Sequence, residues 1–303
     1  MGSAVGSIFT GPFSETFGRN AVYIGTLLLF MVWIMASALS PNIGAQLTFR
    51  FFAGIFGCAP LTCAGGTMAD LWTGFEKTYA FAIFFAIPAF GGATLGPVIG
   101  SYIGTGSLPS WRWTEWITLI MAGLVTILVT LFLPETHPDT LLSWKAKSVR
   151  RSTGNNMYRS QREVNPQSFW IRVKTSLTRP WRLAFEPIVL SMTVYLTIIW
   201  AVLFTFLDGY TSIFRMTYGI SQGMTSIMFI AMYVGIVVAA PMVAVIYTWT
   251  LKDTAHQKDT SRPRPETRLW SAMWGGSWAI PVSLFWLAWT DFVSVEVREI
   301  TGI

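Results

Sequence analysis

The sequence predicts an all-α protein that crosses a lipid bilayer several times. Of its 303 residues, 52% are hydrophobic and only 12% are charged, whereas a soluble domain carries about a quarter charged residues. Seven stretches without Asp, Glu, Lys or Arg are long enough for the about 20 helical residues that a bilayer core requires. Backbone groups in lipid must bond within their own segment, and the stretches lack two-residue alternation, so we predict helices rather than strands.

The seven stretches are bounded by charged residues. They lie between Arg19 and Arg50, Arg50 and Asp70, Lys77 and Arg112, Glu115 and Glu135, Glu186 and Asp208, Arg215 and Lys252, and Arg268 and Asp291. The segment from Met1 to Phe13 is too short to span and is expected to be an incomplete helix. The final stretch, 292–303, contains charged residues and is not expected to continue as a further span.

Basic residues set the expected orientation and domain division. They concentrate in the segment 134–186 and in a second loop at 251–268, and loops rich in Lys and Arg face the cytoplasm. We therefore expect a helical half at 1–133, a basic cytoplasmic linker at 134–186 and a second helical half at 187–303. The linker lacks apolar periodicity and is interpreted as a solvated connection, with a binding segment as the alternative. Its last part, Phe169–Phe185, has the pattern of an amphipathic helix on anionic lipid.

Several function classes find little support in the residues. The excess of basic residues is confined to two loops, which argues against nucleic-acid binding. Cys58 and Cys63 are five residues apart and lie on different helix faces, so neither a disulfide nor a metal site is expected. His137 and His256 fall in polar loops, and no nucleophile–base set or cofactor signature accompanies them. We expect no enzyme, no metal and no cofactor.

Ionisable residues at membrane depth are the first candidates for function, because burying them is costly. Arg50 lies inside an apolar run, where it either extends to the outer headgroups or faces a central cavity. Asp208 ends a predicted span and is either a boundary residue or a proton-coupling group. Glu115 follows Trp111-Arg112-Trp113 and is expected to anchor the membrane interface.

A glycine-rich run stands out in the third stretch. Gly92, Gly96 and Gly100 recur every four residues on one helix face, and small residues at this spacing let helices approach closely. Pro97 removes one backbone hydrogen bond and is expected to bend the helix. Plain helix packing is the alternative to a special function for this run.

These residues resemble motifs of the major facilitator superfamily. The run Gly92-x-x-x-Gly96-Pro97-x-x-Gly100 is similar to the antiporter motif in the fifth helix of its exporters. Arg50-x-x-x-Gly54 resembles the fourth-helix motif, whose arginine the family links to proton coupling. The segment Gly11-x-Phe13-Ser14-Glu15-x-Phe17-Gly18-Arg19 resembles the signature loop between the second and third helices, with Glu15 where Asp is usual.

Further similarities indicate a fungal drug–proton antiporter branch. They occur in family order over nearly the whole chain and include Gly65-Gly66-Thr67-Met68-Ala69-Asp70, Trp111-Arg112-Trp113, Leu133-Pro134-Glu135-Thr136 and Leu284-Phe285-Trp286. Members have twelve helices in two halves of inverted repeats. The resemblance implies that this chain starts within the second helix and ends after the ninth, lacking the first and the last three, so another chain is a possible source of the missing helices.

The resemblance implies proton-coupled efflux of a small lipophilic molecule, such as a secondary metabolite or drug, across the plasma membrane. Arg50 and Asp208 would serve proton coupling, and Thr62, Tyr195 and Trp200 would line the substrate path. Gly92, Gly96, Pro97 and Gly100 would form a tight, bent seam. Polyamine export is one alternative, although it favours several acidic residues at membrane depth. The other alternative is a truncated membrane protein that does not transport.

Overall fold

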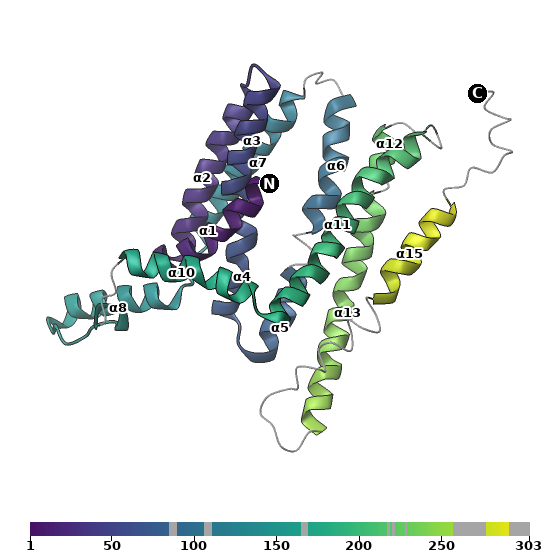
Figure 1. Ribbon diagram of the computed structural model, residues 1–303. Helices are drawn as coiled ribbons and strands as arrows, with labels where there is room; N and C mark the ends of the chain where they lie inside the picture. Colours follow the sequence, from purple (N-terminus) through teal and green to yellow (C-terminus); the bar gives the residue numbers. More distant parts are fainter. Residues whose placement is uncertain are drawn as a thin grey trace, which may run out of the picture. The chain divides into compact units, whose positions relative to one another are not determined.

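The computed structural model describes residues 1–84, 90–105, 111–164, 169–216, 219, 222–227, 229–256 and 277–290. Within these ranges all regular secondary structure is helical, in agreement with the predicted fold class (Figure 1). Five helical segments are long and apolar enough to cross a bilayer. They are Arg19–Ala38, Ile43–Leu71, Arg112–Phe132, Pro187–Gly209 and Gly223–Val243.

Five of the seven predicted stretches largely coincide with a candidate span, and the span Ile43–Leu71 also includes Arg50 and the residues before it. The third stretch carries α5 (Gly74–Phe84) and α6 (Phe90–Thr105), and residues 85–89 lie outside the described ranges. The seventh carries α15 (Ser277–Thr290). Its first part, the rest of the second basic loop beyond His256, and the stretch 292–303 lie outside the described residues. The chain is thus a multi-pass membrane protein.

The helices group into two compact units, Met1–Phe81 with Ile103–Thr197 and Ala82–Tyr102 with Ile198–Ile303. The first unit contains α1 (Gly2–Phe17), α2 (Arg19–Ala38), α3 (Ile43–Gly57), α4 (Ala59–Leu71) and α7 (Arg112–Phe132). The second contains most of α6, with α12 (Gln222–Ile227), α13 (Phe229–His256) and α15. The long helix α11 (Pro187–Met216) belongs to the first unit up to Thr197 and to the second beyond it.

Small residues set the contact between α1 and α3 in the first unit. A Cβ added at Gly6 would overlap the backbone oxygen of Ile55, and one added at Gly54 would lie 3.2 Å from the backbone nitrogen of Ser3. The two backbones therefore approach as closely as glycine allows. The residues between Met1 and Phe13 are helical, as predicted, and the helix continues to Phe17.

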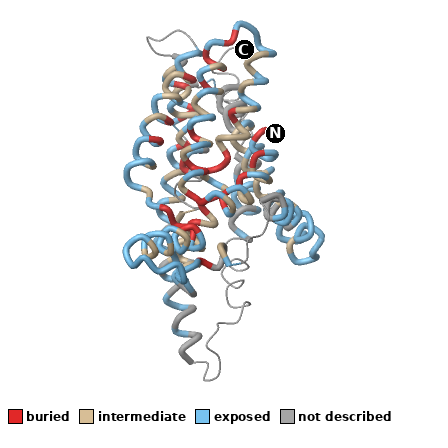
Figure 2. Tube along the Cα trace, turned by 90° about the vertical axis from the view of Figure 1, so that its left-hand side faces the viewer, coloured by how far each residue is buried: buried red, intermediate tan, exposed pale blue. Residues whose placement is uncertain are grey.

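Only a small part of each span is buried within the chain. Figure 2 shows buried residues on the inner helix faces and exposed residues over most of the remaining surface. In the first unit, Val22, Tyr23 and Cys63 form a core cluster, against which Val129 and Leu133 pack. Between 0% and 33% of each candidate span is buried, so most of the apolar surface can contact lipid or further helices.

Much of the linker is helical. It forms α8 (Pro138–Thr153), α9 (Gln161–Val164) and α10 (Phe169–Ala184). α8 is a polar helix that begins with Pro138 and is followed by Gly154, where φ is 65°, and the interpretation of the linker as a solvated connection remains a prediction. The predicted helix near Phe169–Phe185 is confirmed, and it packs against α1. Its binding to lipid remains a prediction.

Candidate functional site

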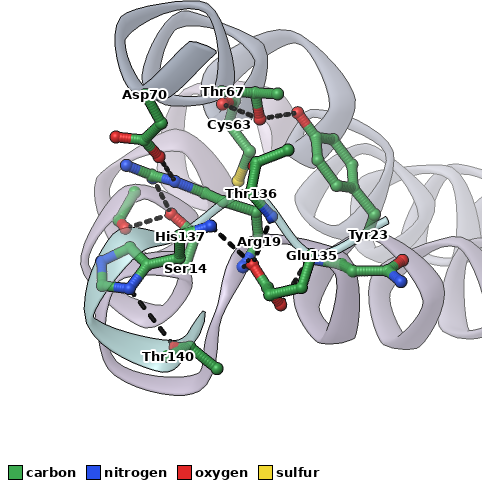
Figure 3. A network of polar contacts seen from close by, with 12 residues as sticks. Ser14, Arg19, Tyr23, Cys63, Thr67, Asp70, Glu135, Thr136, His137 and Thr140 are labelled. Carbon is green, nitrogen blue, oxygen red and sulfur yellow. Dashed lines mark hydrogen bonds and ion pairs between the residues drawn. The ribbon is translucent and has the colours of Figure 1, made fainter. Parts of the chain in front are cut away.

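A one-residue turn joins α1 to α2 and positions a polar network (Figure 3). Gly18 alone separates the two helices, and its φ of 99° is a conformation that glycine adopts without steric cost. This turn lies within the segment that resembles the signature loop. The rest of the signature segment, including Gly11 and Glu15, is helical rather than a loop, because its apolar residues continue α1 to Phe17.

Arg19 is the first residue of α2, and its side chain is held from two other helices. Its Nε donates to Asp70 Oδ2 at 3.1 Å, and its Nη1 donates to Ser14 Oγ at 2.5 Å. The guanidinium lies directly over Gly66, where an added Cβ would overlap it. The side chain of Arg19 is only 10% exposed. The buried charge is thus compensated by one carboxylate and one hydroxyl, as a buried cation requires.

Glu135 fixes the start of α2 from just beyond the end of α7. Its Oε1 accepts hydrogen bonds from the backbone N–H groups of Arg19 at 2.8 Å, Thr136 at 3.0 Å and His137 at 3.0 Å. Its Oε2 accepts from the N–H of Asn20 at 3.3 Å. A carboxylate at a helix N-terminus satisfies unpaired N–H groups and interacts favourably with the helix dipole.

The family motif in the sequence includes Glu135 but does not reveal this role. The only local signal is the glycine at position 18, whose contact with Glu135 becomes visible in the structure. A Cβ at Gly18 would lie 2.5 Å from Glu135 Oε2, so the turn requires glycine for space as well as for its φ. Tyr23 and Thr67 extend the polar contacts inward, with 3.0 Å between their oxygens.

Arg50 of α3 forms an ion pair with Glu115 in the first turn of α7, at the end of α7 opposite to Glu135. Arg50 lies two turns into α3, and its Nε donates to Glu115 Oε1 at 2.8 Å. Its Nη2 also bonds the same oxygen. The Glu115 side chain is 4% exposed and the Arg50 side chain is 53% exposed. The Glu115 carboxylate is thus buried against α3, and its expected place at the membrane interface remains a prediction.

The pair stands in an otherwise apolar setting. Apart from Arg50 and Glu115, the charged residues of α2, α3 and α7 are Arg19, at the opposite end, and Arg112. Arg112 donates from Nη2 to the backbone oxygen of Ser40 at 3.3 Å and lies 5.7 Å from the ring centre of Trp111. The sequence signal for the pair is that α3 carries one charged residue, Arg50, and α7 one acidic residue, Glu115.

The predicted antiporter residues lie on α6 in the second unit, with Gly92 and Gly96 exposed and Pro97 and Gly100 half-buried. A Cβ added at Gly92, Gly96 or Gly100 would meet no atom of the described chain within 4 Å. The close approach involves Gly91 instead, where an added Cβ would lie 3.1 Å from Tyr233 Cε2 of α13. The described helices therefore do not make the tight seam at these three glycines. Pro97 lies inside α6 as predicted, and the motif's role remains a prediction.

The predicted substrate-path and second proton-coupling residues lie on two helices, α4 and α11. Thr62 lies in α4, where its Oγ1 donates to Cys58 O at 2.7 Å and accepts from Thr10 Oγ1 at 3.2 Å. Tyr195 is exposed on α11, and Trp200 of the same helix stacks on Phe204 with 5.8 Å between ring centres. Asp208 is an exposed residue further along α11. Their roles remain predictions.

An apolar groove of about 440 Å³ lies between α1, α2 and α3. Phe9, Phe13, Val22 and Phe56 contribute to its lining, together with the hydroxyl residue Thr10. Sequence reasoning did not identify this groove. Among the described residues no group of three or more His, Cys, Asp or Glu could hold a metal ion. Cys58 and Cys63 are separate free thiols, as their spacing predicts.

Comparison with known proteins gives the family of the chain. The pattern of the Major Facilitator Superfamily matches residues 1–296. The chain is 46% identical over 294 residues to the MFS-type transporter kojT of Aspergillus oryzae, covering 96% of this chain and 52% of that protein. It is 37% identical to the MFS-type efflux pump MFS2 of Trichophyton rubrum, covering 96% and 48% respectively. It is 33% identical to the efflux pump radE of Floropilus chiversii, covering 96% and 53%.

These comparisons agree with the helical architecture and with the motifs read from the sequence. The chain spans about half the length of the curated relatives that it matches. The match to the family pattern extends over both compact units and over the linker helices. The chain belongs to the major facilitator superfamily, within a group of fungal transporters and efflux pumps.

Proposed function

We propose that the protein exports a small lipophilic molecule, such as a secondary metabolite or drug, in exchange for protons. Two relatives that share 33% and 37% identity with the chain are named efflux pumps, which supports the direction. The apolar groove between α1, α2 and α3 supports a lipophilic substrate. The roles of Thr62, Tyr195 and Trp200 on the substrate path belong to this proposal.

The ion pair between Arg50 and Glu115 is the observation that carries proton coupling. An arginine side chain stays charged in proteins at physiological pH. A proton can therefore act on this pair only through the carboxylate. Protonation of Glu115 would remove its negative charge and leave Arg50 without a charged partner at membrane depth, which is costly. The release of Arg50 would then favour a rearrangement between α3 and α7.

The rest of the proposal follows from the family architecture. The two helical halves, 1–133 and 187–303, would rock about a site near the bilayer midplane, and the segment 134–186 would connect them. We place the protein in the plasma membrane with a transport role rather than an enzymatic one. Polyamine export gains no support from Glu115, because Arg50 neutralises that carboxylate. Asp208 would serve as a second proton-coupling residue.

Proteoliposomes with an imposed pH gradient test the coupling. In the complete transporter, Arg50→Ala should abolish pH-driven efflux of rhodamine 6G, and Glu115→Gln should make the remaining efflux independent of the gradient. Arg112→Ala is the matched control, since Arg112 is an arginine near the same end of α7 that bonds a backbone oxygen. Unchanged pH-driven efflux in Arg50→Ala, at equal protein incorporation, would refute the role of the pair.

A further inference from the structure

The end of the linker helix α8 combines basic and hydroxyl side chains. Arg150 and Arg151 directly precede Ser152 and Thr153, and Thr153 is the last residue of the helix. Gly154 follows with a φ of 65°. Every residue from Arg151 to Arg159 is exposed. The segment lies in the part of the chain whose basic residues predict a cytoplasmic location, where protein kinases and ATP are present.

A salt bridge holds the chain after Gly154 against α8. Arg150 donates from Nη1 to Glu163 Oε2 at 2.7 Å and from Nη2 to Glu163 Oε1 at 2.8 Å. Ser160 contacts Ser143 with 3.1 Å between their hydroxyl oxygens. The Arg150 guanidinium lowers the pKa of the Glu163 carboxyl below its ordinary value. This two-bonded pair is the main charged contact between α8 and α9.

We propose that Thr153 is a phosphorylation site and that its phosphate displaces Glu163 from Arg150. The γ-phosphoryl group of ATP would be transferred to Thr153 Oγ1, ADP would leave, and the hydroxyl proton would pass to the kinase. Arginines two and three residues before the acceptor form the kind of charge pattern that an acidic kinase groove selects. For Ser152 the two arginines lie one and two residues before the acceptor, which is one residue too close for the same kinase groove.

Geometry and charge favour the displacement. Thr153 and Arg150 are three residues apart on a helix, a spacing at which side chains meet. A phosphothreonine carries a charge of about −1.5 to −2 and three acceptor oxygens, so it competes with a single carboxylate for the guanidinium. The same charge is unfavourable at a helix C-terminus. It would therefore loosen the last turn of α8, where Thr153 Oγ1 now donates to the Val149 oxygen at 2.7 Å.

In the native protein Thr153 reaches a kinase by unwinding that turn. The cost is small, because the turn is exposed and glycine follows it. The consequence of phosphorylation is the release of α9 from α8. This switch lies within the linker, so it does not depend on the transported substrate or on proton coupling.

The modification is tested on the purified protein with ATP and the catalytic subunit of cyclic-AMP-dependent kinase as the probe. Mass spectrometry should find phosphate on Thr153, Thr153→Ala should lose it, and Ser152→Ala should retain it. Arg150→Ala should reduce the initial rate at least tenfold. Absence of phosphate from Thr153 in the native protein, or its presence on Ser152 alone, would overturn the assignment.

Hydrogen exchange tests the displacement. The amides of Glu163 and Val164 donate to Ser160 O at 2.9 and 3.0 Å, so their exchange reports the order of α9. Phosphorylation should speed their exchange at least tenfold. Glu163→Gln should speed it without phosphate, and phosphorylation should then add little. Unchanged exchange in fully phosphorylated native protein would refute the switch even if the site itself is modified.

Discussion

Replacing Glu135 by Gln tests how the first unit holds the start of α2. The carboxylate accepts four backbone N–H groups, three of them on Oε1. A glutamine keeps one acceptor oxygen but places an NH₂ group where Oε2 accepts from Asn20, so one bond is lost and the others lose their charge. Hydrogen bonds to charged groups contribute about 1.5–3 kcal/mol and neutral ones about 1 kcal/mol. We expect a destabilisation of about 2 kcal/mol.

The buried thiols of the native chain provide the assay. Cys63 is 0% exposed and belongs to the core cluster with Val22 and Tyr23, on which Leu133 also packs, so it is labelled only when this region opens. A loss of about 2 kcal/mol raises the open population about 30-fold. The rate at which a maleimide dye labels Cys63 in detergent should rise by that factor under conditions where opening and closing are fast.

The control is Glu76→Gln, which removes the same charge from an exposed residue in the first turn of α5. That change should alter the labelling rate less than about threefold, since an exposed charge at a helix end contributes about 0.3–1 kcal/mol. Equal labelling rates for native protein and Glu135→Gln would show that the four hydrogen bonds do not hold the unit together. Glu135 would then not be the residue that stabilises the turn at Gly18.

Three further changes probe the glycines and the linker. Gly6→Ala should destabilise the first unit by about 1–3 kcal/mol, because the added Cβ overlaps the α3 backbone. Gly11→Ala is the control and should be neutral or stabilising, because a Cβ there meets open space. Thermal unfolding of the two variants compares their stabilities. Gly18→Ala should cost about 3 kcal/mol from its φ of 99° and the Glu135 contact, and unchanged stability would contradict the need for glycine. Arg150 lowers the pKa of Glu163, so the α8–α9 contact is fully formed above the ordinary glutamate pKa of about 4.3 and is lost as pH falls through the lowered value. Hydrogen exchange of α9 should speed up over that interval in native protein and show no such step in Glu163→Gln.

Hydropathy was sufficient to predict the class of the fold and most of its spans. A crossing requires a long uncharged stretch, and such stretches are visible without any knowledge of tertiary contacts. In the third stretch the structure describes α5 up to Phe84 and α6 from Phe90, which confirms the helical character of the run, and residues 85–89 lie outside the described ranges. In the linker, Pro138 and Gly154 mark the two ends of α8 in the sequence.

The candidate site was predictable one residue at a time but not as pairs. Arg50 was identified because a charge in an apolar run is conspicuous. Its partner Glu115 is 65 positions away, and nothing local distinguishes a buried carboxylate from an interface anchor. The role of Glu135 depends on backbone N–H groups 115 and 116 residues distant. Such contacts arise from the antiparallel packing of α2 with α7, which single-sequence periodicity does not specify.

The two ends of α7 are held by different chemistry, and this difference suggests which end can move. Glu115 lies in its first turn and Glu135 just beyond its last, ~30 Å apart at 1.5 Å per residue. Glu135 bonds the backbone, so its neutralisation would leave several buried N–H groups poorly paired in a fixed turn. Glu115 bonds one flexible side chain that is half exposed. Loss of its charge would free Arg50 without disturbing the backbone. Under the proposed proton coupling, a proton on Glu115 would open a side-chain contact between α3 and α7, whereas the bonds of Glu135 to the start of α2 would keep the opposite end of α7 fixed.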